Sequence, residues 1–286
     1  MLRYPMDEDQ FAKISINWRE DMLCYGLIVV PILDAEEIMQ SQAALWNHMG
    51  PRVTSDYKTW ETENWPQPES PFLSTEYAID EQAFRNRVHP RLIEVYQTLY
   101  GTDRLLTTVD FYGIKRATLF STSERKDWRT KALRLHWDVN VKSYVKDKKS
   151  RYQALIALND NTLDTGSFAC VPGSHTLLSK WITEFNAEDD KYVPKGNFLQ
   201  KYIQRIPIRQ GCAVIWDMGL AHANFENISH QPRLTQYVRM LPNEAWAIAN
   251  EALCITHYWK AHPEHKNRIS RLEWTPQQRQ ILGLRV

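Results

Sequence analysis

The chain has 286 residues, of which 43% are hydrophobic and 24% charged, a composition typical of a soluble globular protein. Its formal net charge of +1 gives no bias toward nucleic acid or a membrane surface. No run reaches the roughly 18 apolar residues of a membrane span, and the N-terminus lacks the apolar core of a secretion signal. Four scattered cysteines without a Cys-x-x-Cys pair indicate reduced thiols. We therefore expect a cytoplasmic protein that neither binds nucleic acid nor spans a membrane.

The first part of the chain predicts helices around one strand. Residues 7–23 have the pattern of a helix, and residues 25–31 form a short apolar run typical of a strand. Asp34 followed by Glu37 is a capping-box signature. It predicts a helix that continues to about residue 48.

A long loop and a second helical region follow. Residues 51–75 are rich in Pro, Trp, Ser and Glu, and loops of this length are often functional. A lid over a binding site and a plain surface excursion are equally compatible with this composition. Residues 81–100 predict a helix, with Gly101 as its C-terminal stop.

Strands dominate the expected structure from residue 105 to 241, and helices close the chain. The closing helices are predicted over 244–260 and 275–282. Thr275 is suited to the N-cap of the last helix and Pro276 to its first position. We therefore expect a mainly β protein with flanking helices.

Polar and apolar side chains alternate strictly over residues 133–140. An alternation with a period of two predicts a strand with two different faces. His136 and Asp138 would then lie side by side, where both can act as metal ligands. The apolar face comprises Leu133, Leu135, Trp137 and Val139, and the polar face Arg134, His136, Asp138 and Asn140.

A later histidine and an arginine extend this pattern. His222 follows the strand-like apolar run 212–217, and segment 233–241 also has the composition of a strand. A period of two places Arg233 and Thr235 on one face of that strand. An arginine fork beside a hydroxyl is a good receptor for a carboxylate, because bidentate pairing is directional as well as charged.

These residues together predict a redox metal site. Two histidines and one carboxylate suit non-haem Fe(II) and leave coordination positions open for chemistry. The predicted iron ligands and catalytic residues are His136, Asp138 and His222, and Arg233 is placed to clamp a dicarboxylate co-substrate. The pattern predicts an Fe(II)- and 2-oxoglutarate-dependent oxygenase that uses O₂.

Several motifs in this order resemble the phytanoyl-CoA dioxygenase family of Fe(II)/2-oxoglutarate oxygenases. The resemblance covers most of the chain and is weakest over residues 51–110 and 176–205. It rests on Tyr25–Pro31 leading into a helix near Asp34, His136-Trp137-Asp138, Gln153–Asp160, Thr165–His175 with its Pro-Gly-Ser-His ending, His222, Arg233, and the segment from Trp274 to Gly283.

The resemblance implies a double-stranded β-helix, a jelly-roll and cupin-like fold, formed by residues 1–286 as a single domain with N-terminal helical support and C-terminal helices. It implies iron on His136, Asp138 and His222, and the distal carboxylate of 2-oxoglutarate on Arg233. Gln153 would line the co-substrate pocket. The implied reaction consumes O₂ and releases succinate and CO₂, with ascorbate considered as a reductant.

The carboxylate ligand bears on the type of reaction. In halogenating relatives this position is a small residue, so Asp138 favours hydroxylation or another oxidation of a small molecule. Two other classes stay open: a non-catalytic module that binds metal and 2-oxoglutarate, and a cupin-like metalloenzyme that needs no keto acid. Arg233 discriminates against the latter. The substrate itself and the oligomeric state cannot be inferred.

Three further features have plainer explanations. Residues 115–151 contain twelve Lys or Arg against four acids, which could attract an anionic substrate. We favour a solvated surface, with Lys142, Lys146, Lys148 and Lys149 in a hairpin connection. His175 is expected in a structural turn. The spacing of His257, His262 and His265 fits no zinc pattern, so a second metal site is not expected there.

Overall fold

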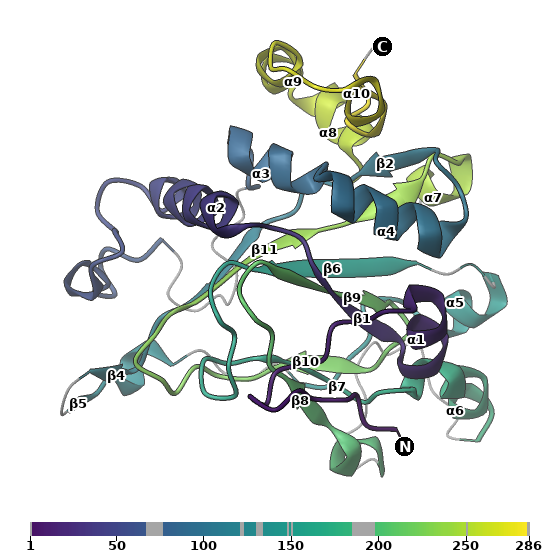
Figure 1. The fold of residues 1–286 in the computed structure, drawn as a ribbon, viewed down its shortest axis with the longest axis horizontal. Coiled ribbons are helices and arrows are strands. Elements are labelled where there is room, and N and C mark those ends of the chain that lie inside the picture. The colour runs from purple at the N-terminus through teal and green to yellow at the C-terminus, as the bar shows by residue number, and fades with distance from the viewer. Residues whose placement is uncertain are drawn as a thin grey trace.

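The computed structural model describes residues 2–66, 77–120, 123–129, 134–147, 149, 151–184, 198–249 and 251–284. Two antiparallel sheets face each other, the smaller one below the larger in Figure 1. The major sheet has the order β1 (Leu27–Pro31), β9 (Cys212–Asp217), β6 (Tyr152–Ala157), β11 (Arg233–Val238) and β3 (Tyr112–Lys115). The minor sheet has the order β10 (His222–Asn224), β7 (Phe168–Cys170) and β8 (Gln204–Ile206). This is the arrangement that the predicted jelly roll requires.

The alternation of each central strand gives the major sheet two apolar faces. Leu155 of β6 and Val214 of β9 point toward the minor sheet and join the core between the sheets. Ala154 and Ile215, one residue away in sequence, join the larger core under the helices. The sheet is therefore buried on both sides, and its inward face can hold a site shielded from water.

Helices cover the outer face of the major sheet, as Figure 1 shows for α2, α3 and α4. The bounds of these helices and of those near the termini are α1 (Trp18–Tyr25), α2 (Ala35–His48), α3 (Glu81–Arg87), α4 (Pro90–Tyr100), α7 (Ala245–Ala249), α8 (Ile255–Ala261), α9 (Pro263–Ser270) and α10 (Pro276–Ile281). The remaining short elements are α5 (Val141–Asp147), α6 (Leu178–Glu184), β2 (Leu105–Thr107) paired with β12 (Met240–Pro242), β4 (Leu119–Phe120) paired with β5 (Ser123–Glu124), and 3-10 turns at Tyr57–Thr59, Lys126–Trp128, Ser174–Leu177 and Phe198–Tyr202.

The predicted helix caps are confirmed. Asp34 and Glu37 form both hydrogen bonds of a capping box before α2, and Thr275 forms another before α10. Gly101 ends α4 with a φ of 69°, a left-handed conformation that glycine adopts without steric cost. These ends depend on local chemistry, which sequence patterns capture well.

Three helix predictions need correction. Residues 7–23 are not one helix, because α1 begins only at Trp18. Region 81–100 contains two helices, since Pro90 starts α4 and the preceding residue cannot continue a helix easily. Region 244–260 is likewise divided into α7 and α8.

The predicted strand over 133–140 is wrong for the residues that the structure describes, 134–140. Only an isolated bridge between His136 and His222 forms there. The next segment is helix α5 rather than a hairpin connection, and it includes Lys142 and Lys146. Residue 133 and Lys148 lie outside the described residues.

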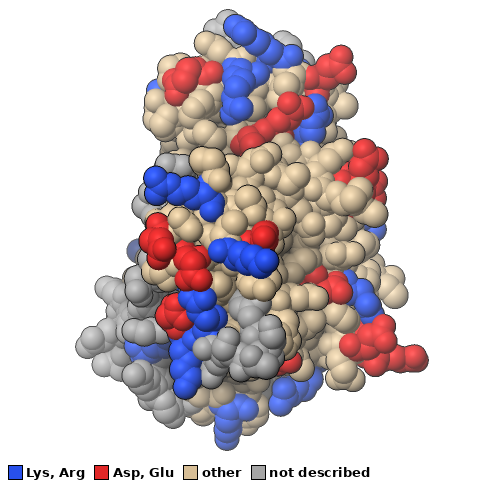
Figure 2. All heavy atoms as spheres, turned by 90° about the vertical axis from the view of Figure 1, so that its left-hand side faces the viewer, with Lys and Arg blue, Asp and Glu red and all other residues tan. Residues whose placement is uncertain are grey.

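Only part of the loop that was considered as a lid, residues 51–75, lies within the described residues. Residues 51–66 form a loop with one 3-10 turn, and 67–75 are not described. Within the described ranges, no helix has the length and apolar character that crossing a bilayer demands. On the face seen in Figure 2, acidic and basic side chains are interspersed rather than gathered into a patch of one sign.

Candidate active site

His136, Asp138 and His222 meet in one place. The backbone N–H groups of His136 and His222 each donate to the other residue's carbonyl, at 2.9 and 3.0 Å, and the two rings are 4.4 Å apart. Asp138 Oδ2 is 3.0 Å from His222 Nε2, and its Oδ1 is 3.5 Å from His136 Nε2. One ligand atom from each residue lies within 4.8 Å of the others. A single metal ion can therefore contact all three.

Backbone carbonyls orient both imidazole rings. His136 Nδ1 is 2.8 Å from the Arg134 carbonyl oxygen, and His222 Nδ1 is 3.0 Å from that of Leu220. A carbonyl can only accept, so Nδ1 of each ring carries a proton, and the neutral form of each ring would offer the Nε2 lone pair to a metal. Histidines that bind metals are commonly held in this way. This donor set fits a divalent ion such as Fe(II).

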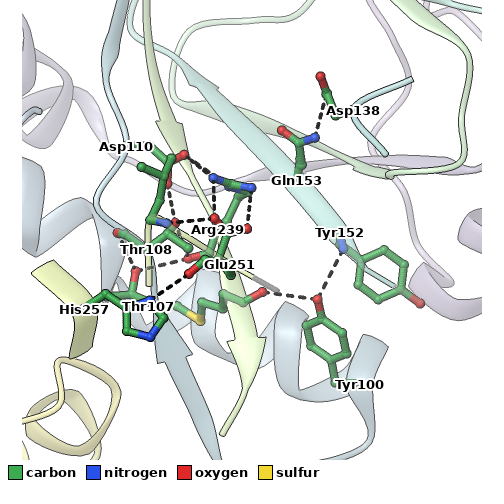
Figure 3. A network of polar contacts seen from close by, with 12 residues as sticks. Tyr100, Thr107, Thr108, Asp110, Asp138, Tyr152, Gln153, Arg239, Glu251 and His257 are labelled. Atoms are coloured by element: carbon green, nitrogen blue, oxygen red, sulfur yellow. Dashed lines mark hydrogen bonds and ion pairs between the residues drawn. The ribbon is translucent and has the colours of Figure 1, made fainter. Parts of the chain in front are cut away.

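Gln153 of β6 holds the carboxylate of this group. Its Nε2 donates to Asp138 Oδ2 at 2.6 Å (Figure 3). Burial tends to raise the pKa of the Asp138 carboxyl, but His222 and His136 outweigh burial and hold the pKa well below its usual range. Asp138 is thus ionised and oriented, as a metal ligand must be.

A cavity of about 170 Å³ opens beside these residues. It lies where β6, β9, β10 and β11 approach one another, so both sheets contribute to its wall. Its lining comprises Asp110, Phe111, His136, Asp138, Gln153, Trp216, His222, Asn224 and Tyr237. Gln153 therefore lines this cavity, and its amide contacts Asp138; its place in a co-substrate pocket stays a prediction.

Arg233 lies behind this wall, only 3% exposed. Its Nη1 donates to Asn224 Oδ1 at 2.8 Å and its Nε to Asn161 Oδ1 at 3.0 Å. Its Nη2 is buried and has no hydrogen-bond partner among the described residues. Burial lowers the pKa of Arg233, while Tyr237 acts in the opposite direction. The guanidinium is therefore held by neutral groups, with one donor nitrogen left over.

Lys115 is a second buried cation beside Arg233. The two residues are direct partners in the pairing of β3 with β11, and the Lys115 Nζ donates to the Phe225 carbonyl. Burial and then the charge of Arg233 lower the pKa of Lys115 well below its usual range. The charge of Glu226 acts in the opposite direction, and an anion bound beside the two residues would likewise favour the charged form of Lys115.

Thr235 does face the same side as Arg233, but its hydroxyl is engaged. Thr235 Oγ1 donates to the Gly113 carbonyl at 3.0 Å. A hydroxyl has one hydrogen, so it has none left for a carboxylate in this arrangement. Gly113 is required here, because a Cβ at that position would come within 2.4 Å of Thr235 Oγ1.

Another arginine, Arg239, pairs with Asp110, which lines the cavity (Figure 3). Its Nε and Nη2 donate to Asp110 Oδ1 at 3.1 and 2.9 Å, and its Nη1 to Glu251 Oε2 at 2.8 Å. Burial opposes its charge, but Asp110 and Glu251 outweigh burial and raise the pKa of Arg239. Thr108 also donates to Asp110 Oδ2. This network is complete without a ligand.

Two observations indicate that the residues of this site fit 2-oxoglutarate. Trp216 Nε1, in the cavity wall, is a buried donor without a partner among the described residues, as is Arg233 Nη2. Unpaired buried donors are costly unless something accepts from them. A dicarboxylate supplies acceptors of the required charge.

Sequence analysis missed Lys115, Asn224 and Trp216 at this site. Asn224 follows His222 by two residues on a strand and so shares its face, a signal that was present. Trp216 lies on the inward face of the predicted strand 212–217. Lys115 could not have been found locally, because only the long-range pairing of β3 with β11 places it next to Arg233.

Of the other sequence candidates, His175 lies in the 3-10 turn after Gly173. It belongs to neither of the potential metal-binding groups among the described residues. His262 and His265 form the second such group with Glu264, and His257 does not join it.

Comparison with known proteins shows which families and folds this chain is similar to. The model of the family "Phytanoyl-CoA dioxygenase (PhyH)" matches residues 115–235, which include every candidate ligand. A Dictyostelium discoideum protein whose name places it provisionally among the phytanoyl-CoA dioxygenases is 23% identical over 264 residues, covering 76% of this chain and 73% of that protein.

Solved structures share the fold. The epimerase SnoN, in complex with Fe³⁺, α-ketoglutarate and nogalamycin RO, gives a TM-score of 0.57 at 17% identity over 79% of this chain and 82% of SnoN. EctD from S. alaskensis, with 2-oxoglutarate and 5-hydroxyectoine, gives 0.52 at 18% identity over 79% and 75%. The carbocyclase SnoK gives 0.55 at 18% identity over 80% and 85%.

The fold is thus the double-stranded β-helix of the Fe(II)/2-oxoglutarate oxygenases. The segment 115–235 is similar to the phytanoyl-CoA dioxygenase family, and the whole chain is distantly similar to one protein that carries that family's name.

Proposed function

We propose that this protein is an Fe(II)- and 2-oxoglutarate-dependent dioxygenase that hydroxylates a small molecule and releases succinate and CO₂. The observation that supports this most strongly is the buried, unpaired Nη2 of Arg233. Asn224 connects Arg233 to the candidate metal ligands. It accepts a hydrogen bond from Arg233 and lies on the same strand as His222.

The proposed roles follow from these contacts. His136, Asp138 and His222 would hold iron, which supplies oxidation by O₂ when bound. Arg233 would pair with the distal carboxylate of 2-oxoglutarate, and Lys115 would add a second positive charge. Gln153 would keep the Asp138 carboxylate turned toward the metal. Thr235 would act indirectly, by fixing β11 against Gly113.

The cavity wall suggests how water is excluded. Trp216 and the ring of Phe168 pack 4.8 Å apart, and His222 lies against both. An apolar wall around the metal strengthens electrostatic contacts inside and limits side reactions. Residues 1–286 would act as one domain, because β1 near the N-terminus joins the major sheet and residues of α8 and α10 belong to the larger core under the helices.

Hydroxylation is favoured over halogenation by the presence of Asp138, which occupies the position that a halide would need. The names of similar structures also include an epimerase and a carbocyclase. Analysis of the product formed from an identified small-molecule substrate distinguishes these oxidations. Ascorbate is proposed only as a reductant that would sustain repeated turnover.

The function is tested by succinate formation from 2-oxoglutarate by the purified chain with Fe(II), without a prime substrate. Asp138→Ala is the matched variant, with circular dichroism as the folding control. Slow succinate release by the wild type and none by the variant would support the proposal. Equal release by both would refute the metal assignment.

Two other outcomes define the alternatives. Iron-dependent binding of 2-oxoglutarate, without succinate even when candidate substrates are added, would identify a binding module. Metal binding without any affinity for 2-oxoglutarate would identify a cupin-like metalloprotein, and the role proposed for Arg233 would be wrong.

A further inference from the structure

A second cluster of metal-binding side chains lies at the junction of α8 and α9, far along the chain from the candidate iron ligands. His262 Nδ1 is 3.6 Å from Glu264 Oε1, and His265 Nε2 is 3.7 Å from the same oxygen. One ligand atom from each of the three lies within 4.8 Å of the other two. We propose that His262, Glu264 and His265 bind a divalent transition-metal ion, with Zn²⁺ as the expected ion.

The backbone fixes the spacing of these ligands. The N–H of His262 donates to the Tyr258 carbonyl at 2.9 Å and so belongs to the end of α8. Pro263 is the first residue of α9, and its ring locks φ near the helical value. His262 and His265 are three residues apart across this first turn, a spacing that places side chains on one face. Their rings are stacked 5.3 Å apart.

A hydrogen bond prepares His265 for a metal. Its Nδ1 is 2.7 Å from the Tyr258 hydroxyl. When Nδ1 carries the ring proton and donates it to Tyr258, Nε2 presents its lone pair toward Glu264. Outer contacts of this kind orient metal-binding histidines and strengthen binding. Tyr258 is itself fixed, because it is 7% exposed and packs against Tyr77.

The ligand chemistry defines the class of ion. Two imidazoles and one carboxylate suit Zn²⁺, Cu²⁺ or Ni²⁺, whereas Mg²⁺ and Ca²⁺ prefer oxygen ligands alone. The side chains of His262, Glu264 and His265 are 40%, 62% and 27% exposed. Solvent can therefore complete the coordination, and the ion can enter without opening the fold.

His257 is not part of this site. Its Nδ1 is 3.2 Å from the Glu251 carbonyl oxygen, and it belongs to neither metal-binding group among the described residues. The three C-terminal histidines thus do not form one cluster. The third member of the cluster is Glu264 rather than His257. The spacing of the histidines in the sequence did not indicate Glu264.

The test is Zn²⁺ titration of the whole chain by calorimetry, with Co²⁺ absorption as an independent probe. His265→Ala and Glu264→Gln should each bind one equivalent less than the wild type, and His257→Ala should bind the same number. The same one-equivalent difference is expected in a His222→Ala background, whether or not the candidate iron site still binds metal. Tyr258→Phe should weaken Zn²⁺ binding by about 10- to 100-fold.

Two results would overturn the proposal. One is an unchanged number of Zn²⁺ equivalents in both His265→Ala and Glu264→Gln. The other is loss of an equivalent in His257→Ala with none lost in His265→Ala. Because the ligands are at the surface, these variants are expected to fold, and circular dichroism verifies this for each.

Discussion

Arg233 of β11 is buried and Arg239, just after β11, is largely buried, yet their surroundings are opposite. Arg239 is paired with Asp110 and Glu251, and these acids raise its pKa against the effect of burial. Arg233 contacts two asparagines, has Lys115 as its strand partner, and has its pKa lowered by burial.

We infer from this difference that Arg239 serves the fold and that Arg233 serves a ligand. A buried ion pair that loses one partner destabilises a protein strongly, because the other charge remains unpaired. Arg239 is in such a network. A buried cation without an acid is costly to the folded state, so we infer that an anion binds beside Arg233, between the sheets. The comparison therefore predicts stability effects at Arg239 and binding effects at Arg233.

The largest effect is expected for Arg239→Leu. This change leaves Asp110 and Glu251 buried without their cation and should lower the free energy of unfolding by about 3–5 kcal/mol. Urea unfolding followed by circular dichroism measures it. A loss below about 1 kcal/mol, similar to a typical single substitution, would mean that the network is not structural.

Arg233→Leu is expected to act mainly on the co-substrate. Loss of a charge-assisted contact of roughly 2–4 kcal/mol should raise the apparent KM for 2-oxoglutarate on the order of 30- to 1000-fold. Its effect on unfolding should be smaller than that of Arg239→Leu, because no carboxylate loses its partner. An unchanged KM for 2-oxoglutarate would show that Arg233 does not hold the co-substrate.

Gln153→Leu sharpens the assignment at the metal. The variant removes the amide that donates to Asp138 Oδ2 while keeping a side chain of similar size. We expect metal affinity to fall by about 10- to 100-fold, measured by Mn²⁺ titration in the absence of 2-oxoglutarate. If only 2-oxoglutarate binding changed, Gln153 would be a co-substrate contact rather than a positioning residue.

Lys115→Met tests the buried cation pair through pH. The folded-state pKa of Lys115 is lowered below its unfolded value of about 10.4. Between these two values the unfolded chain binds more protons, so Lys115 makes stability rise with pH. The difference in unfolding free energy between wild type and Lys115→Met should therefore change in favour of the wild type as pH increases. Urea unfolding over this alkaline range checks the sign, and a pH-independent difference would contradict it.

The smallest effect is expected for Thr235→Val. The variant loses the hydrogen bond to the Gly113 carbonyl at a cost of about 1 kcal/mol in stability. The affinity for 2-oxoglutarate should change much less than in Arg233→Leu. A comparable loss of affinity in calorimetry would restore Thr235 as a direct contact.

Sequence patterns predicted β11, which carries Arg233, and β9, which precedes His222, because both are six-residue ladder strands of the major sheet. They did not predict β10, the three-residue strand that carries His222. Residues 134–140 were misassigned for a physical reason. Trp137 and Val139 pack into an outer apolar cluster while His136 and Asp138 face the cavity. The alternation of polar and apolar residues therefore indicates that the two faces of an extended segment have different surroundings. It does not require that the segment is hydrogen-bonded to a neighbouring strand.

Lys115 shows the other limit of sequence analysis. It was counted within a basic stretch of expected surface residues, yet it is 2% exposed. Only the register of β3 against β11 places it beside Arg233. Contacts of this kind depend on long-range pairing, which local composition does not specify.

The most direct test of the central claim compares two keto acids by calorimetry with Mn²⁺ under anaerobic conditions. 2-Oxoglutarate has a distal carboxylate, and 2-oxobutanoate lacks it. The wild type should bind 2-oxoglutarate far more tightly than 2-oxobutanoate, and Arg233→Leu should lose most of this preference. Equal preference in the two proteins would show that Arg233 does not hold the distal carboxylate.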